Sequence, residues 1–97
     1  MSQPVAEVGG YKNITATGAV STGACQLIGF YVNNTSSGTL VLRNGGASGD
    51  VMSGTITPAI GFHRFPAYVS SSVYATIGGT LDVTFFYAAY YVRERLR

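Results

Sequence analysis

Groups that can do chemistry are scarce in this sequence. Its 97 residues include one cysteine, one histidine and four acidic residues, and 10% of the residues are charged, against about 25% in a typical soluble domain. The single cysteine excludes a disulfide bond within the chain. No stretch approaches the ~20 apolar residues of a membrane helix, and a net charge of +2 is too small to indicate a nucleic-acid-binding surface. We therefore expect neither a membrane nor a nucleic acid as a partner.

The few reactive residues do not form a catalytic motif. As a general base, His63 would need a nucleophile and an orienting acid, and no motif supplies them; a histidine beside an aromatic side chain is the simpler interpretation. Cys25 lies in an apolar segment and is expected to be a small buried residue. His63, Arg64 and Asp50 form a candidate phosphate or carboxylate site. No pair of His, Cys, Asp or Glu has metal-ligand spacing, so we expect no enzyme, metal or cofactor.

Strand patterns, by contrast, run through most of the chain. Residues 73–87 predict a β-hairpin with Gly78-Gly79 as its turn, because glycine adopts the positive φ of tight hairpin turns. The second strand alternates, which assigns its residues to two faces: Leu81, Val83, Phe85 and Tyr87 on one, and Asp82, Thr84, Phe86 and Ala88 on the other.

The other segments complete an all-β pattern. Residues 25–33 are apolar on both faces and predict a central strand; Leu27 and Tyr31 are expected on one face, and Ile28, Phe30 and Val32 on the other. Residues 33–38 predict a turn. Pro66 favours an edge strand or a bulge. About seven short strands, spaced near ten residues apart, are typical of an antiparallel β-sandwich or a small barrel. We expect an arm over residues 1–10, a β-domain over 11–88 and a tail over 89–97.

Apolar and aromatic residues are abundant enough to suggest contacts outside the core. The chain is 46% hydrophobic and has seven tyrosines, a residue type that is enriched in interfaces. With so few charges, exposed apolar patches and self-association are expected. The alternatives are a soluble monomer covered by Ser, Thr and Asn, with tyrosines that border the core, and tyrosines that stack against sugars.

Four segments resemble small structural proteins of tailed bacteriophages and prophages. They are residues 11–18 (YKNITATG), 27–32 (LIGFYV), 37–42 (SGTLVL) and 73–84 (VYATIGGTLDVT). The resemblance implies a compact antiparallel β-sandwich, with a jelly roll as one form, that decorates or cements a capsid. Such proteins commonly act as homotrimers and lock neighbouring subunits of the major capsid protein together. This chain departs from the common pattern by continuing past Tyr87.

The resemblance also implies where the protein acts. We expect it on the outer surface of the virion, made in the host cytoplasm because residues 1–10 do not have the pattern of a secretion signal. Its alternative role is a head-fibre or tail component that binds host glycans through surface tyrosines. The candidate capsid or subunit contacts lie in the arm and the tail: Pro4, Val5, Val8, Tyr90, Tyr91, Arg93, Arg95 and Arg97.

Overall fold

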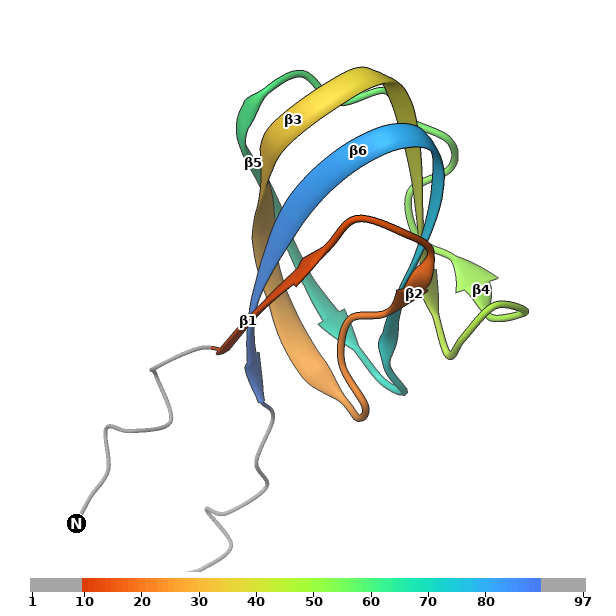
Figure 1. Ribbon diagram of the computed structural model, residues 1–97. Helices are drawn as coiled ribbons and strands as arrows, with labels where there is room; N and C mark the ends of the chain where they lie inside the picture. The colour runs from red at the N-terminus through yellow and green to blue at the C-terminus, as the bar shows by residue number, and fades with distance from the viewer. Residues whose placement is uncertain (1–9, 90–97) are drawn as a thin grey trace, which may run out of the picture.

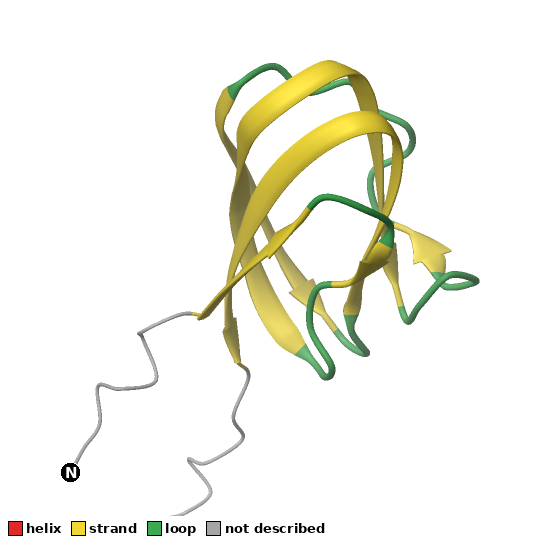
Figure 2. Cartoon of the chain, in the orientation of Figure 1, coloured by secondary structure: helices red, strands yellow, loops and turns green. Residues whose placement is uncertain are grey.

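The computed structural model describes residues 10–89, which form six β-strands and no helix (Figure 1, Figure 2). All six strands belong to one antiparallel sheet. In chain order they are β1 (Gly10–Ile14), β2 (Gly18–Ala19), β3 (Cys25–Asn44), β4 (Asp50–Val51), β5 (Gly61–Val69) and β6 (Val73–Ala89).

Two long strands, β3 and β6, form the central ribbon of the sheet. They pair from Cys25 opposite Ala89 to Asn44 opposite Val73. In one half of the ribbon, β5 pairs with the outer edge of β3 and β1 with the outer edge of β6. In the other half, β4 and β2 take the corresponding places. Figure 1 shows the two long strands arching side by side, so that the halves of the sheet face each other.

The arch is produced by irregular pairing in the middle of the ribbon. The register shifts between Val32 and Asn34 and again between Ser36 and Ser37, and bulges of this kind bend a strand and increase its twist. Ser37 and Gly79 both have positive φ, at 56° and 70°. Gly38 lies against the β6 backbone, where a Cβ would collide with the carbonyl oxygen of Thr80. The bend therefore depends on residues without bulky side chains.

The hairpin predicted for residues 73–87 is wrong. Val73 to Ala89 is one continuous strand, and it pairs with β3 rather than with itself. Gly78 and Gly79 lie at the bend of the ribbon instead of in a turn. The turn predicted for residues 33–38 is wrong for the same reason, because this stretch also belongs to a continuous strand, β3. Local composition predicted turns at the places where the two strands bend, but the chain does not reverse direction there.

The concave side of the arch holds the hydrophobic core. The predicted alternation in β6 is confirmed for Leu81, Val83 and Phe85, which are all buried. Their neighbours Asp82, Thr84 and Phe86 are only partly covered. Phe30 and Phe85 are cross-strand partners, with ring centroids 5.6 Å apart. The remaining buried apolar residues are Ile14, Val20, Cys25, Leu27, Val32, Leu40, Leu42, Val69, Val73 and Ala75.

A bulge at Ile28 changes the predicted faces of β3. Leu27 pairs with Tyr87 and Gly29 with Phe86, so β3 has one extra residue against β6. Against β5, Leu27 pairs with Ala67 and Gly29 with Arg64, so the register shifts at the same place. As a result Leu27 and Phe30 are both buried, whereas Ile28 and Tyr31 are exposed. The assignment of Leu27 and Tyr31 to one face is therefore wrong. The prediction of an edge strand or a bulge at Pro66 is confirmed on both counts.

Side-chain hydrogen bonds link the end of β3 and the loop after β2 to the segment around the start of β6. Asn44, the last residue of β3, donates from Nδ2 to Ser70 Oγ at 3.0 Å and accepts the Ser71 N–H at 3.0 Å. Ser21 is buried after β2, and its Oγ accepts the Val73 N–H at 2.9 Å. These bonds hold the chain segments around the start of β6 together.

Ser21→Ala is expected to lower the free energy of unfolding by about 2 kcal/mol, because it leaves the buried Val73 N–H without an acceptor. For a domain of this size the midpoint of thermal unfolding would fall by about 10 °C. Circular dichroism during heating measures this shift. Ser48→Ala is the matched control, since Ser48 is exposed and makes no hydrogen bond. Equal midpoints for the two variants would contradict the role of Ser21.

The predicted all-β class is confirmed. The two separate sheets of a sandwich and the strand order of a jelly roll are not confirmed, since all six strands belong to one curled sheet, and two of them are long rather than short. The predicted arm over 1–10 and tail over 89–97 lie almost wholly outside the described residues.

Candidate functional site

The convex side of the sheet carries an unusual concentration of exposed apolar side chains. Tyr11 is 74% exposed on β1 and Phe62 is 49% exposed on β5, although both lie within strands. We call this surface the outer aromatic face and define it by five residues that project from the four strands of one half of the sheet: Tyr11, Ile28, Tyr31, Phe62 and Phe86.

The register of the strands explains why these side chains meet. Tyr11 lies opposite Phe86, and Tyr31 lies opposite Phe62. Residues directly opposite each other project from the same face of a sheet. The rings of Phe62 and Phe86 come from strands on either side of β3 and are 6.2 Å apart at their centroids. Gly29 lies between them on β3, where a Cβ would be 2.9 Å from Phe62 Cζ. The missing side chain lets the two rings approach each other.

A polar ladder borders the outer aromatic face. Asp82 Oδ1 accepts hydrogen bonds from Asn13 Nδ2 at 2.7 Å and from Asn33 Nδ2 at 3.3 Å. Thr84 Oγ1 accepts from the same two amides, at 3.0 and 3.1 Å. The ladder links β1, β6 and β3 at the surface. These bonds fix the side chains in place, so the polar and aromatic groups present a preorganised surface.

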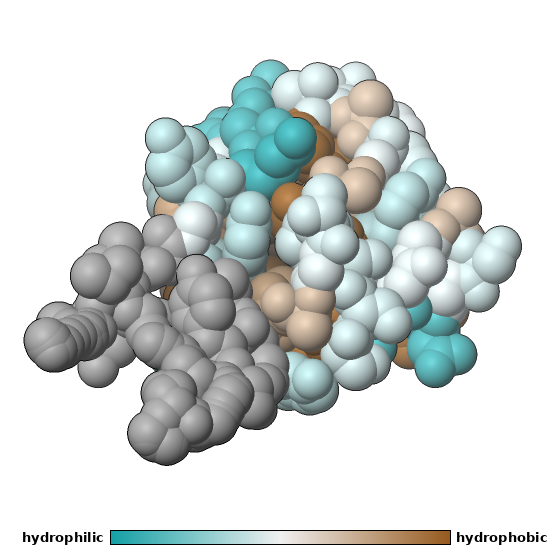
Figure 3. Space-filling model, turned by 90° about the horizontal axis from the view of Figure 1, so that it is seen from below, coloured by the Kyte–Doolittle hydropathy of each residue, from teal (hydrophilic) through white to brown (hydrophobic). Residues whose placement is uncertain are grey.

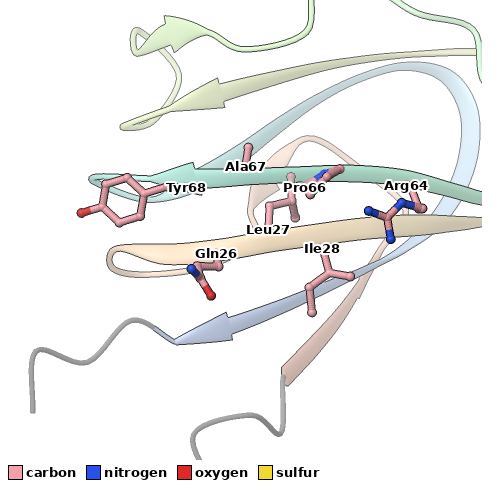
Figure 4. Close-up of a pocket in the computed structure, with 7 residues that line it drawn as sticks. All are labelled: Gln26, Leu27, Ile28, Arg64, Pro66, Ala67 and Tyr68. Carbon is pink, nitrogen blue, oxygen red and sulfur yellow. The ribbon is translucent and has the colours of Figure 1, made fainter. Parts of the chain in front are cut away.

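A groove opens at the bulge between β3 and β5 (Figure 4). It has a volume of about 360 Å³ and is open to solvent. Leu27 and Ala67 form a register pair beneath it. Figure 4 shows that the other lining side chains come from both strands, with Arg64 and Tyr68 towards opposite ends; they are Gln26, Ile28, Arg64, Pro66 and Tyr68.

Arg64 gives the groove a positive charge that no side chain of residues 10–89 neutralises. Within residues 10–89 its guanidinium forms no hydrogen bond or ion pair. The acidic residues in that range are Asp50 and Asp82, and Asp82 is bonded to the amides of the polar ladder. The groove therefore presents an available cation beside apolar side chains.

The candidate phosphate or carboxylate site of His63, Arg64 and Asp50 does not form as predicted. His63 pairs with Phe30, whereas Asp50 pairs with Asn44 at the far end of β3. The His63 ring stacks on Phe30 with centroids 5.2 Å apart, and its Nε2 lies 2.8 Å from the Ala59 carbonyl oxygen. The expected aromatic neighbour of His63 is thus confirmed. Of the three residues, Arg64 alone lines the groove.

Cys25 is 1% exposed, which confirms the prediction of a small buried residue. In the part of the chain that the structure describes, no three His, Cys, Asp or Glu side chains are close enough to hold a metal ion. The predicted contacts in the terminal segments lie outside residues 10–89, namely Pro4, Val5, Val8, Tyr90, Tyr91, Arg93, Arg95 and Arg97.

Sequence reasoning missed most of the outer surface. Tyr11 and Phe62 lie on edge strands, where a strand pattern gives no indication of which face is covered. Ile28 was expected to face the same way as Phe30, and the bulge reversed it. The alternation in β6 did separate Phe86 from the core, and this was the one signal that pointed to the outer face.

Apolar surface also shows at the lower end of the molecule. In Figure 3, brown atoms form a band through the middle of this end, between paler and teal surfaces. No helix between residues 10 and 89 is long and apolar enough to cross a membrane. Comparisons with family models, curated proteins and solved structures find no significant match to this chain.

Proposed function

We propose that this protein is a structural component of a phage virion that decorates the head and cements neighbouring subunits of the major capsid protein. The observation that carries the proposal is the outer aromatic face, which spans four strands of one rigid sheet. Interfaces are enriched in aromatic residues and depleted in charge at their centres. The resemblance of four strand segments to phage structural proteins supports the phage setting.

The curled sheet suits a role as a cement. Its long ribbon is continuous across the whole domain, so a force applied at one end is shared by many backbone hydrogen bonds. A shell bound by many copies gains stability from contacts that are individually modest, because each copy buries apolar area at about 25 cal/mol per Å². Self-association as a homotrimer belongs to the same proposal, with exposed apolar residues as its driving force.

Attachment to heads is expected to depend on the outer aromatic face. The double variant Tyr31→Ser/Phe62→Ser should lower the occupancy on purified phage heads at least tenfold, since it removes two exposed rings from the centre of the proposed contact. Occupancy is measured by cosedimentation and by electron microscopy of the particles. Deletion of residues 1–10 or 90–97 in parallel tests the predicted terminal contacts.

Val51→Ser/Ile60→Ser is the matched control, because both residues are exposed and apolar but lie outside the outer aromatic face. It should bind heads as the unmodified protein does. Heads that never carry the unmodified protein would refute the capsid role. Equal loss in both double variants would place the contact elsewhere on the molecule.

The second candidate is a head-fibre or tail component that binds host glycans. The polar ladder of Asn13, Asp82 and Asn33 favours it, because amide and carboxylate groups beside aromatic rings are the groups that bind sugar hydroxyls and stack on sugar rings. A glycan array probed with the whole protein tests this candidate, and the absence of any bound glycan would refute it.

A further inference from the structure

The groove between β3 and β5 combines apolar walls with a positive charge that has no partner among the described residues. We propose that it binds an acidic sugar residue, such as a uronic or sialic acid within a larger glycan, and that Arg64 holds the sugar carboxylate. The groove has a volume of about 360 Å³ and is open to solvent. It lies at the bulge between Leu27 and Gly29, where the regular pairing of the two strands is interrupted.

The positive charge of Arg64 indicates that the ligand of the groove is an anion. This guanidinium lines the groove and has no partner within residues 10–89. A planar guanidinium binds a carboxylate through two parallel N–H···O bonds, which fix both its position and its orientation. Among residues 10–89 no acidic side chain lines the groove, so none of these residues repels an anion there.

The walls of the groove fit a sugar ring. Ile28 and Pro66 supply apolar surface, and Tyr68 supplies an aromatic ring that is 58% exposed. A pyranose ring presents C–H groups on one face, which pack against such surfaces, and hydroxyl groups around its rim. The Gln26 amide can both donate to and accept from those hydroxyls. Apolar walls with a few polar groups are typical of small-molecule sites.

An acidic peptide fits the groove less well. Extended peptides commonly bind by adding a strand to a free sheet edge, and β5 is such an edge. Pro66 lies in that strand at the groove and supplies no N–H for a ladder. The groove is also short, since seven residues line it. A compact acidic ring is therefore the better occupant.

The inference deepens the second candidate function, on which it rests, by naming the class of glycan and a site in the groove, apart from the polar ladder. It does not rest on attachment to capsids, so a failed head-binding experiment would leave it standing. Failure of the groove to bind acidic sugars would in turn leave the cement proposal untouched.

Nuclear magnetic resonance titration of the full-length protein tests the inference. The probes are three acidic oligosaccharides: trigalacturonate, sialyllactose and a hyaluronan tetrasaccharide. We expect at least one to shift the backbone amide signals of Gln26, Ile28 and Ala67 in a saturable way. The same oligosaccharide without its charge, as the methyl ester, should bind at least tenfold more weakly.

Variants of Arg64 separate the site from general attraction of anions. R64Q should weaken binding at least tenfold, whereas R64K should retain part of the affinity because it keeps the charge but loses the fork geometry. K12Q is the matched control, since it removes the same charge from an exposed residue of β1 outside the groove. Its affinity should stay within twofold of the unmodified protein.

Three outcomes would overturn the inference. The first is that none of the acidic oligosaccharides binds at millimolar concentration. The second is that K12Q and R64Q lose affinity equally, which would indicate nonspecific electrostatic attraction. The third is that triglutamate binds in the groove as tightly as the best oligosaccharide, which would make the occupant an acidic peptide.

Discussion

Phe85→Ala is expected to lower the free energy of unfolding by about 4 kcal/mol, near the upper end of what a single core truncation costs. Phe85 is 0% exposed in the middle of the arch, and its ring lies 5.6 Å from that of Phe30. Removing it leaves a cavity that two strands paired over their whole length cannot collapse to fill. Urea unfolding followed by circular dichroism measures the loss, and tyrosine fluorescence provides a second probe.

The adjacent residue supplies the matched control. Phe86 lies on the same strand but projects from the convex side and is partly exposed, so Phe86→Ala should cost only about 1 kcal/mol. If Phe85→Ala leaves too little folded protein to measure, Phe85→Leu should show about a third of its loss. Equal losses of unfolding free energy in Phe85→Ala and Phe86→Ala would contradict the assignment of Phe85 to the core and Phe86 to the convex side.

The pair of phenylalanines shows what the sequence predicts well. A period of two in residues 81–87 needs only the geometry of an extended strand, and it correctly separates Phe85 in the core from Phe86 outside. The same reasoning correctly predicted the burial of Cys25 and the edge position of Pro66. These properties depend on residues within one strand, so one sequence is enough to find them.

Properties that depend on a partner strand were not predictable in this way. Gly78-Gly79 has the composition of a hairpin turn, yet both residues belong to one continuous strand because β3 pairs with β6 on either side of them. Residues 33–38 have the composition of a turn and belong to β3 for the same reason. The bulge that turns Ile28 and Phe30 to opposite faces depends on how β3 pairs with β5 and β6, which come much later in the chain, and no local pattern indicates it.

The candidate site was even harder to predict from the sequence than the fold. The outer aromatic face is assembled from four strands, and its central contact needs Phe62, Phe86 and the space above Gly29. Each residue alone is typical of a strand. The shape of such a surface depends on the curvature of the sheet. The bend of the ribbon produces that curvature, so both the core and the outer aromatic face depend on it.

Gly38→Ala is expected to break that bend and to lower the free energy of unfolding by about 3 kcal/mol. A Cβ at this position would collide with the carbonyl oxygen of Thr80 and lie 2.9 Å from Leu81 Cβ. The contacts are mainly with backbone, so a side-chain rotation cannot relieve them and the two central strands must separate. Thermal unfolding followed by circular dichroism measures the loss. The variant should also weaken the proposed attachment to phage heads, because the strands beneath the outer aromatic face move apart.

Gly23→Ala is the control that isolates steric collision from the general effect of replacing glycine. No atom lies within 4 Å of a Cβ at this position, and Gly23 does not have a positive φ. Alanine there restricts the unfolded chain and should stabilise the protein by about 0.5 kcal/mol. Gly79→Ala should fall between the two, with a loss of about 1 kcal/mol, because its φ of 70° strains an L-residue. The expected order of stability is therefore Gly23→Ala, then Gly79→Ala, then Gly38→Ala. If Gly38→Ala proved as stable as Gly23→Ala, β3 and β6 would not approach as closely as described, and the arch would need another cause.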